Sequence, residues 1–210
     1  MRTLIVNGTV VNANGSQQAD VLIDGETIAA VGRGLAAIAG TVDRTIDAAG
    51  KLVIPGGIDV HTHMELPFGG TFAKDTFESG TRAAAFGGTT TVIDFAVQSR
   101  GRSLREGLDT WHAKAQGNCA IDYGFHMIMS DVTDDSLREM DQLVAEGVPD
   151  FKLFTAYPGV FFSDDGAIFR AMQQTGRNGG MIMMHAENGL AIRSEERTSE
   201  LQSRETISYA

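Results

Sequence analysis

Short β-branched runs separated by turn pairs fill the first 53 residues. The runs cover residues 3–6, 9–12, 19–23 and 27–31. Asn-Gly or Asp-Gly pairs interrupt them at residues 7–8, 14–15 and 24–25. Such pairs are the strongest short-range signal for a β-hairpin. The pattern predicts that residues 1–53 form a small antiparallel β unit.

From Leu52 onward, apolar strand-like runs alternate with stretches of helical periodicity. One run ends at His63, and the others cover residues 89–95, 121–129, 150–155 and 181–185. The helical stretches cover residues 75–86, 103–116, 134–146 and 164–174, with glycines just after them. Regular alternation predicts parallel strands joined by right-handed crossovers.

The fold class predicted for residues 54–192 is α/β, as part of a TIM (β/α)8 barrel. Five strands and four helices are counted, whereas a complete barrel takes roughly 250 residues. A doubly wound sheet is the competing interpretation. It is disfavoured because no glycine-rich phosphate-binding fingerprint follows any of the strands.

Composition excludes several classes of protein. The net charge is −10 and basic residues do not cluster, so nucleic acid is not an expected partner. There is no apolar run of ~18 residues, so no membrane span is expected, and the apolar start is too short for a signal peptide. Cys119 is the single cysteine, which rules out an internal disulfide and predicts a cytoplasmic location.

Two histidines follow the first strand of the predicted barrel. His61 and His63 are two residues apart on an extended chain, so both side chains point to the same side. Paired imidazoles at this spacing can form half of a zinc site. The alternative is a pair of structural histidines that form hydrogen bonds at a strand end.

Two more polar residues lie on later strands. Lys152 lies among apolar neighbours in the run at residues 150–155. A buried ammonium there is costly unless it is paired with an anion or loses its proton. A lysine of low pKa can react with carbon dioxide to give a carbamate, which can bridge two metal ions; the alternative is a salt bridge to a barrel carboxylate. His185 ends the fifth strand and faces the same mouth, although a lone histidine there is more often structural. His126 is expected in the core or behind the site, and Cys119 is expected to be inert.

Four motifs together resemble the dihydropyrimidinase/hydantoinase branch of the amidohydrolase superfamily. They are His61-Thr-His63, Phe86-Gly-Gly-Thr-Thr-Thr-Val-Ile-Asp-Phe, Lys152-Leu-Phe-Thr-Ala-Tyr157-Pro-Gly and His185-Ala-Glu-Asn. The resemblance extends from residue 1 to about 192. It implies a metal-bearing TIM barrel and a small β-sandwich, of which residues 1–53 are the N-terminal portion.

The resemblance also implies a site with two divalent metal ions, zinc by default. His61 and His63 would hold the more buried ion, and Lys152, as N6-carboxylysine, would bridge both. His185 would bind the more exposed ion, and Tyr157 would donate its hydroxyl to the developing oxyanion. The substrate implied is a small cyclic amide, a 5,6-dihydropyrimidine or a hydantoin opened to an N-carbamoyl amino acid. The substrate-binding residues that the resemblance implies are Tyr157, Leu66, Phe154 and Phe161. Two apolar loops, residues 64–68 and 158–162, would close over the ring substituent of the substrate. The alternative is that these loops pack internally or contact another subunit.

Other features of the family are not found in this chain. The family uses a further histidine from the sixth strand and an aspartate from the eighth, so the 210-residue chain alone is expected to be inactive. Residues 193–210 resemble a translated sequencing adapter and are expected to be a non-family tail, the alternative being a charged helix. The full-length protein is expected to be a homotetramer.

Three other functions remain open. One is a non-catalytic dihydropyrimidinase-like assembly protein, although such relatives have lost metal ligands that are present here. The others are allantoinase and dihydroorotase. The apolar Met64-Glu65-Leu66 segment argues against dihydroorotase, which usually has an arginine near its first histidine pair.

Overall fold

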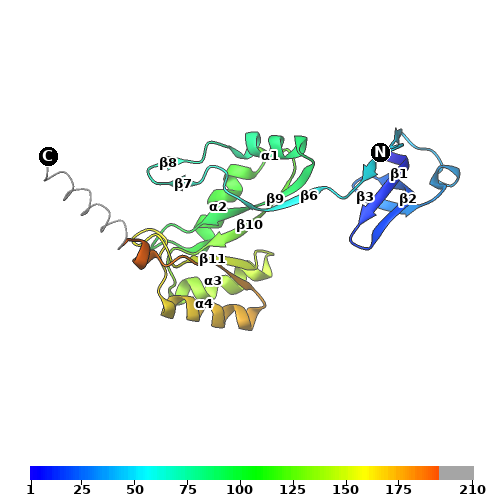
Figure 1. Cartoon of the computed structure of the whole chain (residues 1–210). Coiled ribbons are helices and arrows are strands. Elements are labelled where there is room, and N and C mark those ends of the chain that lie inside the picture. Colours follow the sequence, from blue (N-terminus) through cyan, green and yellow to red (C-terminus); the bar gives the residue numbers. More distant parts are fainter. Residues whose placement is uncertain (194–210) are drawn as a thin grey trace, which may run out of the picture. The chain divides into compact units, whose positions relative to one another are not determined.

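The computed structural model describes residues 1–193 in two compact units (Figure 1). The first unit is Met1–Gly56, and the second begins at Gly57. The expected non-family tail, apart from its first residue, lies outside the described residues. In the described part of the chain, no helix is long and apolar enough to cross a membrane.

The first unit is a mixed sheet of five strands. In chain order they are β1 (Arg2–Asn12), β2 (Gly15–Asp24), β3 (Thr27–Gly32), β4 (Arg44–Asp47) and β5 (Leu52–Val53). β1, β2 and β3 are antiparallel, but β4 and β5 both pair with β1 in parallel. The prediction of a purely antiparallel unit is therefore wrong. The pairing of β1 with β4 and β5 depends on contacts some 40 residues apart, which local turn signals do not reveal.

The Asn7-Gly8 pair is not a hairpin turn. β1 continues through it, with an irregularity in its register to β2 between Ile5 and Gly8, and Asn7 takes a left-handed φ of 64°. A Cβ atom on Gly8 would lie 2.6 Å from Cγ2 of Val53. The glycine therefore permits close approach of the neighbouring strand β5, and the asparagine accommodates a bulge.

The second unit contains a five-stranded parallel sheet. Its strands are β6 (Gly57–Thr62), β9 (Thr89–Val97), β10 (Asp122–Ile128), β11 (Asp150–Phe154) and β12 (Met181–His185). They lie side by side in chain order, β12-β11-β10-β9-β6. A doubly wound sheet reverses its strand order at a switch point, and this sheet does not. The prediction of a partial TIM barrel is confirmed.

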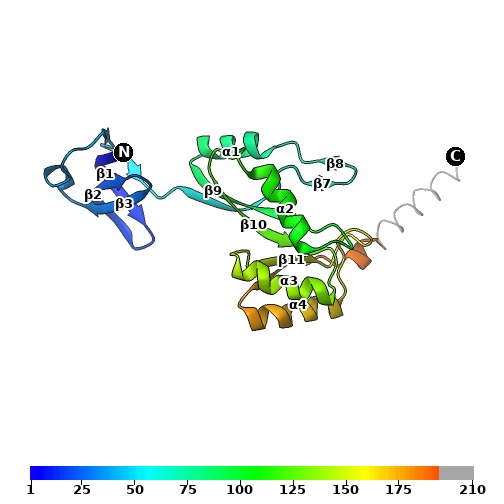
Figure 2. The same ribbon diagram turned by 180° about the vertical axis from the view of Figure 1, so that it is seen from behind.

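Four helices connect these strands and pack along the sheet (Figure 2). They are α1 (Phe77–Phe86), α2 (Leu104–Ala115), α3 (Asp134–Ala145) and α4 (Asp165–Asn178). Hydroxyl or carboxylate side chains cap all four N-termini, at Thr76, Ser103, Thr133 and Asp164. α4 continues beyond Gln174, the last residue of the predicted helix, and ends before Gly179, one of the glycines expected to terminate it, which has a φ of 78°.

Alternate strand residues form two cores. One core joins strand residues such as Met127 and Leu153 to the helices, through Leu108 and Trp111 for example. The other lies on the opposite face, towards the barrel interior, and contains Phe95, Ile128, Phe154 and Phe161. Since side chains alternate along a strand, Lys152 faces the same side as Phe154, the interior of the barrel.

Candidate active site

A cavity of about 420 Å³ opens at the carboxyl ends of β6, β11 and β12. All eight side chains singled out in the sequence line it, together with two others. They are His61, His63, Leu66, Lys152, Phe154, Tyr157, Phe161 and His185, with Phe68 and Ile128. The structure thus brings together residues that are up to 124 positions apart in the chain, from His61 to His185.

Three nitrogen atoms converge at the base of this cavity. Nε2 of His61 lies 3.2 Å from Nε2 of His63 and 3.3 Å from Nζ of Lys152. Two nitrogen ligands of a tetrahedral zinc ion, each about 2.0–2.1 Å from the metal, lie about 3.3 Å apart. The spacing of the two imidazole nitrogens therefore fits a shared cation.

The surroundings of this cluster keep the imidazoles neutral. Burial, then the charges of Lys152 and His61, lowers the pKa of His63 from its ordinary 6.5 to about 4. The pKa of His61 is lowered as well, by burial first and then by Lys152 and His126. A neutral imidazole keeps a lone pair free, which a metal ion requires.

Lys152 is only 6% exposed and lies against aromatic rings. Its Nζ is 4.3 Å from the ring centroid of Phe95 and 5.2 Å from that of Phe154. No carboxylate among residues 1–193 forms an ion pair with it, so the alternative of a lysine paired with a barrel carboxylate is not observed. Burial lowers the pKa of Lys152, which increases the fraction of neutral amine.

The ring of Phe95 forms the floor beneath the three nitrogens. Its centroid is 4.7 Å from the His61 ring and 4.9 Å from the rings of His63 and His126. Sequence reasoning missed Phe95, because an apolar residue in a β-branched strand looks like any other core position.

His126 packs against the ring of Phe95. Its Nε2 is 3.1 Å from the carbonyl oxygen of Val60, and its Nδ1 is 3.1 Å from Asp150. The residue before His61 is therefore tied to β10 and β11 by this buried histidine. This agrees with the expectation that His126 lies behind the site.

His185 lines the same cavity but stands apart from the three nitrogens. Its ring stacks on Phe154 at 5.3 Å, and its Nε2 lies 3.3 Å from an oxygen of Glu187. Within the described residues, no three His, Cys, Asp or Glu side chains converge closely enough to bind one ion. The tight cluster in this part of the chain therefore consists of two imidazoles and the Lys152 amine.

Tyr157 enters the cavity from the loop after β11. Its backbone has a φ of 59°, which is rare for an aromatic residue and is typical of functional loops. The Tyr157 carbonyl accepts hydrogen bonds from the amides of residues 160, 161 and 162, which stabilises this turn. The ring lies 5.3 Å from the His185 ring and 5.4 Å from the Phe68 ring.

Phe68 belongs to a small hairpin that sequence analysis expected only as an apolar loop. β7 (Pro67–Phe68) pairs with β8 (Thr71–Phe72) across Gly69 and Gly70, both at positive φ. The Phe68 ring also stacks on Phe161, at 6.2 Å. The apolar loop residues thus pack over one side of the cavity.

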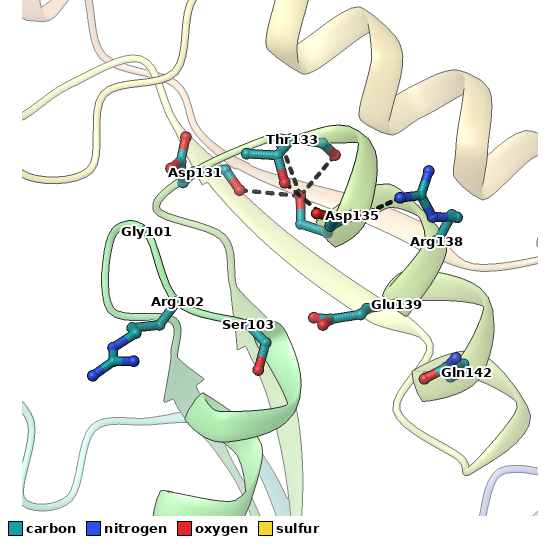
Figure 3. Close-up of a pocket in the computed structure, with 10 residues that line it drawn as sticks. Gly101, Arg102, Ser103, Asp131, Thr133, Asp135, Arg138, Glu139 and Gln142 are labelled. Carbon is teal, nitrogen blue, oxygen red and sulfur yellow. Dashed lines mark hydrogen bonds and ion pairs between the residues drawn. The ribbon is translucent and has the colours of Figure 1, made fainter.

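A larger hollow of about 530 Å³ lies outside the barrel mouth, between the loop before α2 and the start of α3 (Figure 3). Among its charged side chains, Arg138 pairs with Asp135, and Glu139 accepts a hydrogen bond from the Leu104 amide at the N-terminus of α2. None of the predicted site residues lines it. The smaller cavity is therefore the candidate active site.

Cys119 does not line this cavity, and burial raises the pKa of its thiol, as expected of an inert cysteine.

In TIM barrels the active site lies at the carboxyl ends of the strands, which is where this cavity opens. The sequence matches the amidohydrolase family over residues 52–206. It is 67% identical to a D-hydantoinase of Streptomyces coelicolor over 193 residues, 91% of this chain and 41% of that protein. It is 43% identical to a dihydropyrimidinase of Rattus norvegicus, covering 90% of this chain and 37% of that protein.

Structural comparison agrees. The crystal structure of dihydropyrimidinase from Brevibacillus agri superposes with a TM-score of 0.88 at 45% identity, over 95% of this chain and 43% of that one. The chain belongs to the dihydropyrimidinase/D-hydantoinase family of the amidohydrolase superfamily. It spans about 41% of the length of the Streptomyces relative.

Proposed function

We propose that the complete gene product is a metal-dependent hydrolase that opens cyclic amide rings of the 5,6-dihydropyrimidine or hydantoin type. The observation that carries the proposal is the triangle of His61, His63 and Lys152 in an apolar cavity with Tyr157 beside it. The reaction adds water across the ring amide: the C–N bond breaks, oxygen joins the carbonyl carbon, and the nitrogen takes a proton. The product is an N-carbamoyl amino acid.

The lysine is proposed to act as a carboxylated residue. The neutral amine of Lys152 attacks carbon dioxide, an N–C bond forms, and the amine loses a proton, which leaves a carbamate anion. Its lowered pKa and its lack of a carboxylate partner in the described residues both favour this reaction. A carbamate offers two oxygens where the amine offered one nitrogen, and so can join two ions.

Each remaining residue has one proposed task. His61 and His63 would hold one ion through their neutral nitrogens, and His185 would hold a second. Bound divalent cations, zinc by default, would supply hydroxide at neutral pH and polarise the ring carbonyl. The Tyr157 hydroxyl donates to the oxygen that becomes negative during attack. Leu66, Phe154 and Phe161 form the apolar wall for the ring substituent.

The proposal is tested on the complete gene product, by elemental analysis for metal and by assays with dihydrouracil and hydantoin. We expect bound divalent metal and formation of the N-carbamoyl product from at least one substrate. His61→Asn should abolish both, whereas the matched control His112→Asn, on the exposed side of α2, should change neither. The same assay on residues 1–210 alone is expected to show no activity.

Two outcomes would favour the alternatives. Absence of both metal and ring opening would support a non-catalytic assembly protein. Metal binding with hydrolysis of only allantoin or dihydroorotate would assign the same site to another cyclic amidase. We further propose a cytoplasmic homotetramer, which sedimentation of the gene product would test.

A further inference from the structure

One carboxylate, Asp94, holds the segment that carries the histidine pair. Asp94 lies on β9 and is completely buried, yet it is not among the cavity residues. Its Oδ2 accepts hydrogen bonds from the Thr62 hydroxyl at 2.9 Å and from the Met64 amide at 2.8 Å. These two donors flank His63, so a single oxygen grips the chain on both sides of a proposed ligand.

The other oxygen of Asp94 is attached to the scaffold. Oδ1 accepts from the Phe95 amide at 2.7 Å and from the indole nitrogen of Trp111, on α2, at 3.2 Å. Trp111 belongs to the buried core between sheet and helices. Asp94 therefore links the loop after β6 to a packed part of the barrel.

The strand itself supplies little restraint at this point. The pairing of β6 with β9 shifts in register between Asp59 and Thr62, and Thr62 is the last residue of β6. The Met64 amide beyond it bonds to the Asp94 side chain instead of a neighbouring strand. Without the carboxylate, the chain around His63 would lose both bonds at the place where the ladder ends.

We infer that Asp94 is a positioning residue, which fixes His61 and His63 at the spacing that a shared metal ion needs. This inference rests on the proposed function. Asp94 is the acceptor in all four of its hydrogen bonds, and an ionised carboxylate can only accept. An asparagine would turn an NH2 group towards donors on one side. Supporting groups behind metal ligands typically affect metal affinity by 10–100-fold.

The test is made on the complete gene product and distinguishes the hydrogen bonds accepted by Oδ2 of Asp94 from those accepted by Oδ1. Asp94→Asn and Thr62→Val weaken the hydrogen bonds that hold the segment around His63. Trp111→Phe removes only the hydrogen bond between Asp94 and helix α2. Zinc affinity is measured by competition with a chromophoric chelator, ligand geometry by the visible spectrum of the cobalt-loaded protein, and stability by the thermal unfolding midpoint.

We expect Asp94→Asn and Thr62→Val to lower zinc affinity by roughly tenfold or more and to shift the cobalt bands. Trp111→Phe should lower the unfolding midpoint but leave affinity and spectrum unchanged. Wild-type affinity and spectrum in Asp94→Asn, or an equal loss in Trp111→Phe, would overturn the inference. If Asp94→Asn does not fold, the comparison of Thr62→Val with Trp111→Phe decides. A wild-type protein that binds no zinc contradicts the proposed function as well, so the two failures are distinguishable.

Discussion

Nζ of Lys152 lies 3.3 Å from Nε2 of His61, and both groups rest against the ring of Phe95. A protonated amine and a protonated imidazole at this distance would repel each other. Burial lowers the pKa of Lys152, and burial first and then the charge of Lys152 lower the pKa of His61. The arrangement favours a site in which the lysine nitrogen is neutral or carboxylated.

Replacing Lys152 should therefore abolish both metal binding and ring opening in the complete gene product. Lys152→Arg keeps a positive charge but cannot form a carbamate, so it should be as inactive as Lys152→Ala. Small carboxylic acids such as acetate should partly restore Lys152→Ala, because they can occupy the vacated space with two oxygens.

Activity and metal content are measured with and without added acetate. The matched control is Lys51→Ala, an exposed lysine of the first unit, which should behave as wild type. Full activity in Lys152→Arg would contradict the carbamate.

Removing the Tyr157 hydroxyl should slow the chemical step. Tyr157→Phe keeps the ring contacts with Phe68 and His185, so substrate affinity should change little. Loss of one oxyanion donor lowers kcat by about 10²–10³-fold. Steady-state kinetics that show an increase in KM alone would assign Tyr157 to binding instead. Phe162→Leu, in the same loop but outside the cavity lining, is the control and should keep kcat.

The metal-free protein should lose stability in acid because of His63. The unfolded chain protonates this imidazole near pH 6.5, but the folded protein does so only near pH 4. Between these values the unfolded state binds more protons, so the free energy of unfolding rises with pH and this contribution levels off above 6.5.

Urea unfolding of chelator-treated protein between pH 4 and 7 measures this dependence. His63→Gln should show a shallower slope in that window than wild type. Identical slopes would mean that His63 is protonated as easily in the folded protein as in the unfolded chain.

The sequence predicted the barrel well because its signals are local and periodic. Apolar strands and amphipathic helices alternate, and hydroxyl or carboxylate caps mark the helix starts. Strand order and the convergence of His61, Lys152 and His185 follow from the parallel topology. Arg44–Asp47 was missed as a strand because a four-residue polar segment becomes a strand only through its pairing with β1.

The supporting residues could not be predicted for a different reason. Asp94 and Phe95 are neighbours in an ordinary alternating strand, and their roles depend on which face each one presents. Asp94 meets the loop after β6, while Phe95 meets the imidazoles on the other side. That distinction is a tertiary property, so it required the structure.

Two glycines in helices should respond to alanine in opposite directions. A Cβ atom on Gly107, in α2, would lie 2.7 Å from the Val97 carbonyl oxygen and 2.8 Å from Cε of Met127. The helix and β9 would have to separate, so Gly107→Ala should cost about 1–3 kcal/mol. Gly176, in α4, is exposed, and a Cβ atom there would point into open space with no atom of another element within 4 Å.

Gly176→Ala should therefore stabilise the protein by up to about 1 kcal/mol, because alanine loses less backbone freedom on forming a helix. Chemical denaturation of both variants beside wild type gives the comparison, and each serves as the control for the other. Equal effects of the same sign would mean that the close contact between α2 and β9 does not limit the size of residue 107. If the contact does, Gly107→Ala should also raise the accessibility of the buried core around Met127, which hydrogen exchange of the β10 amides would report.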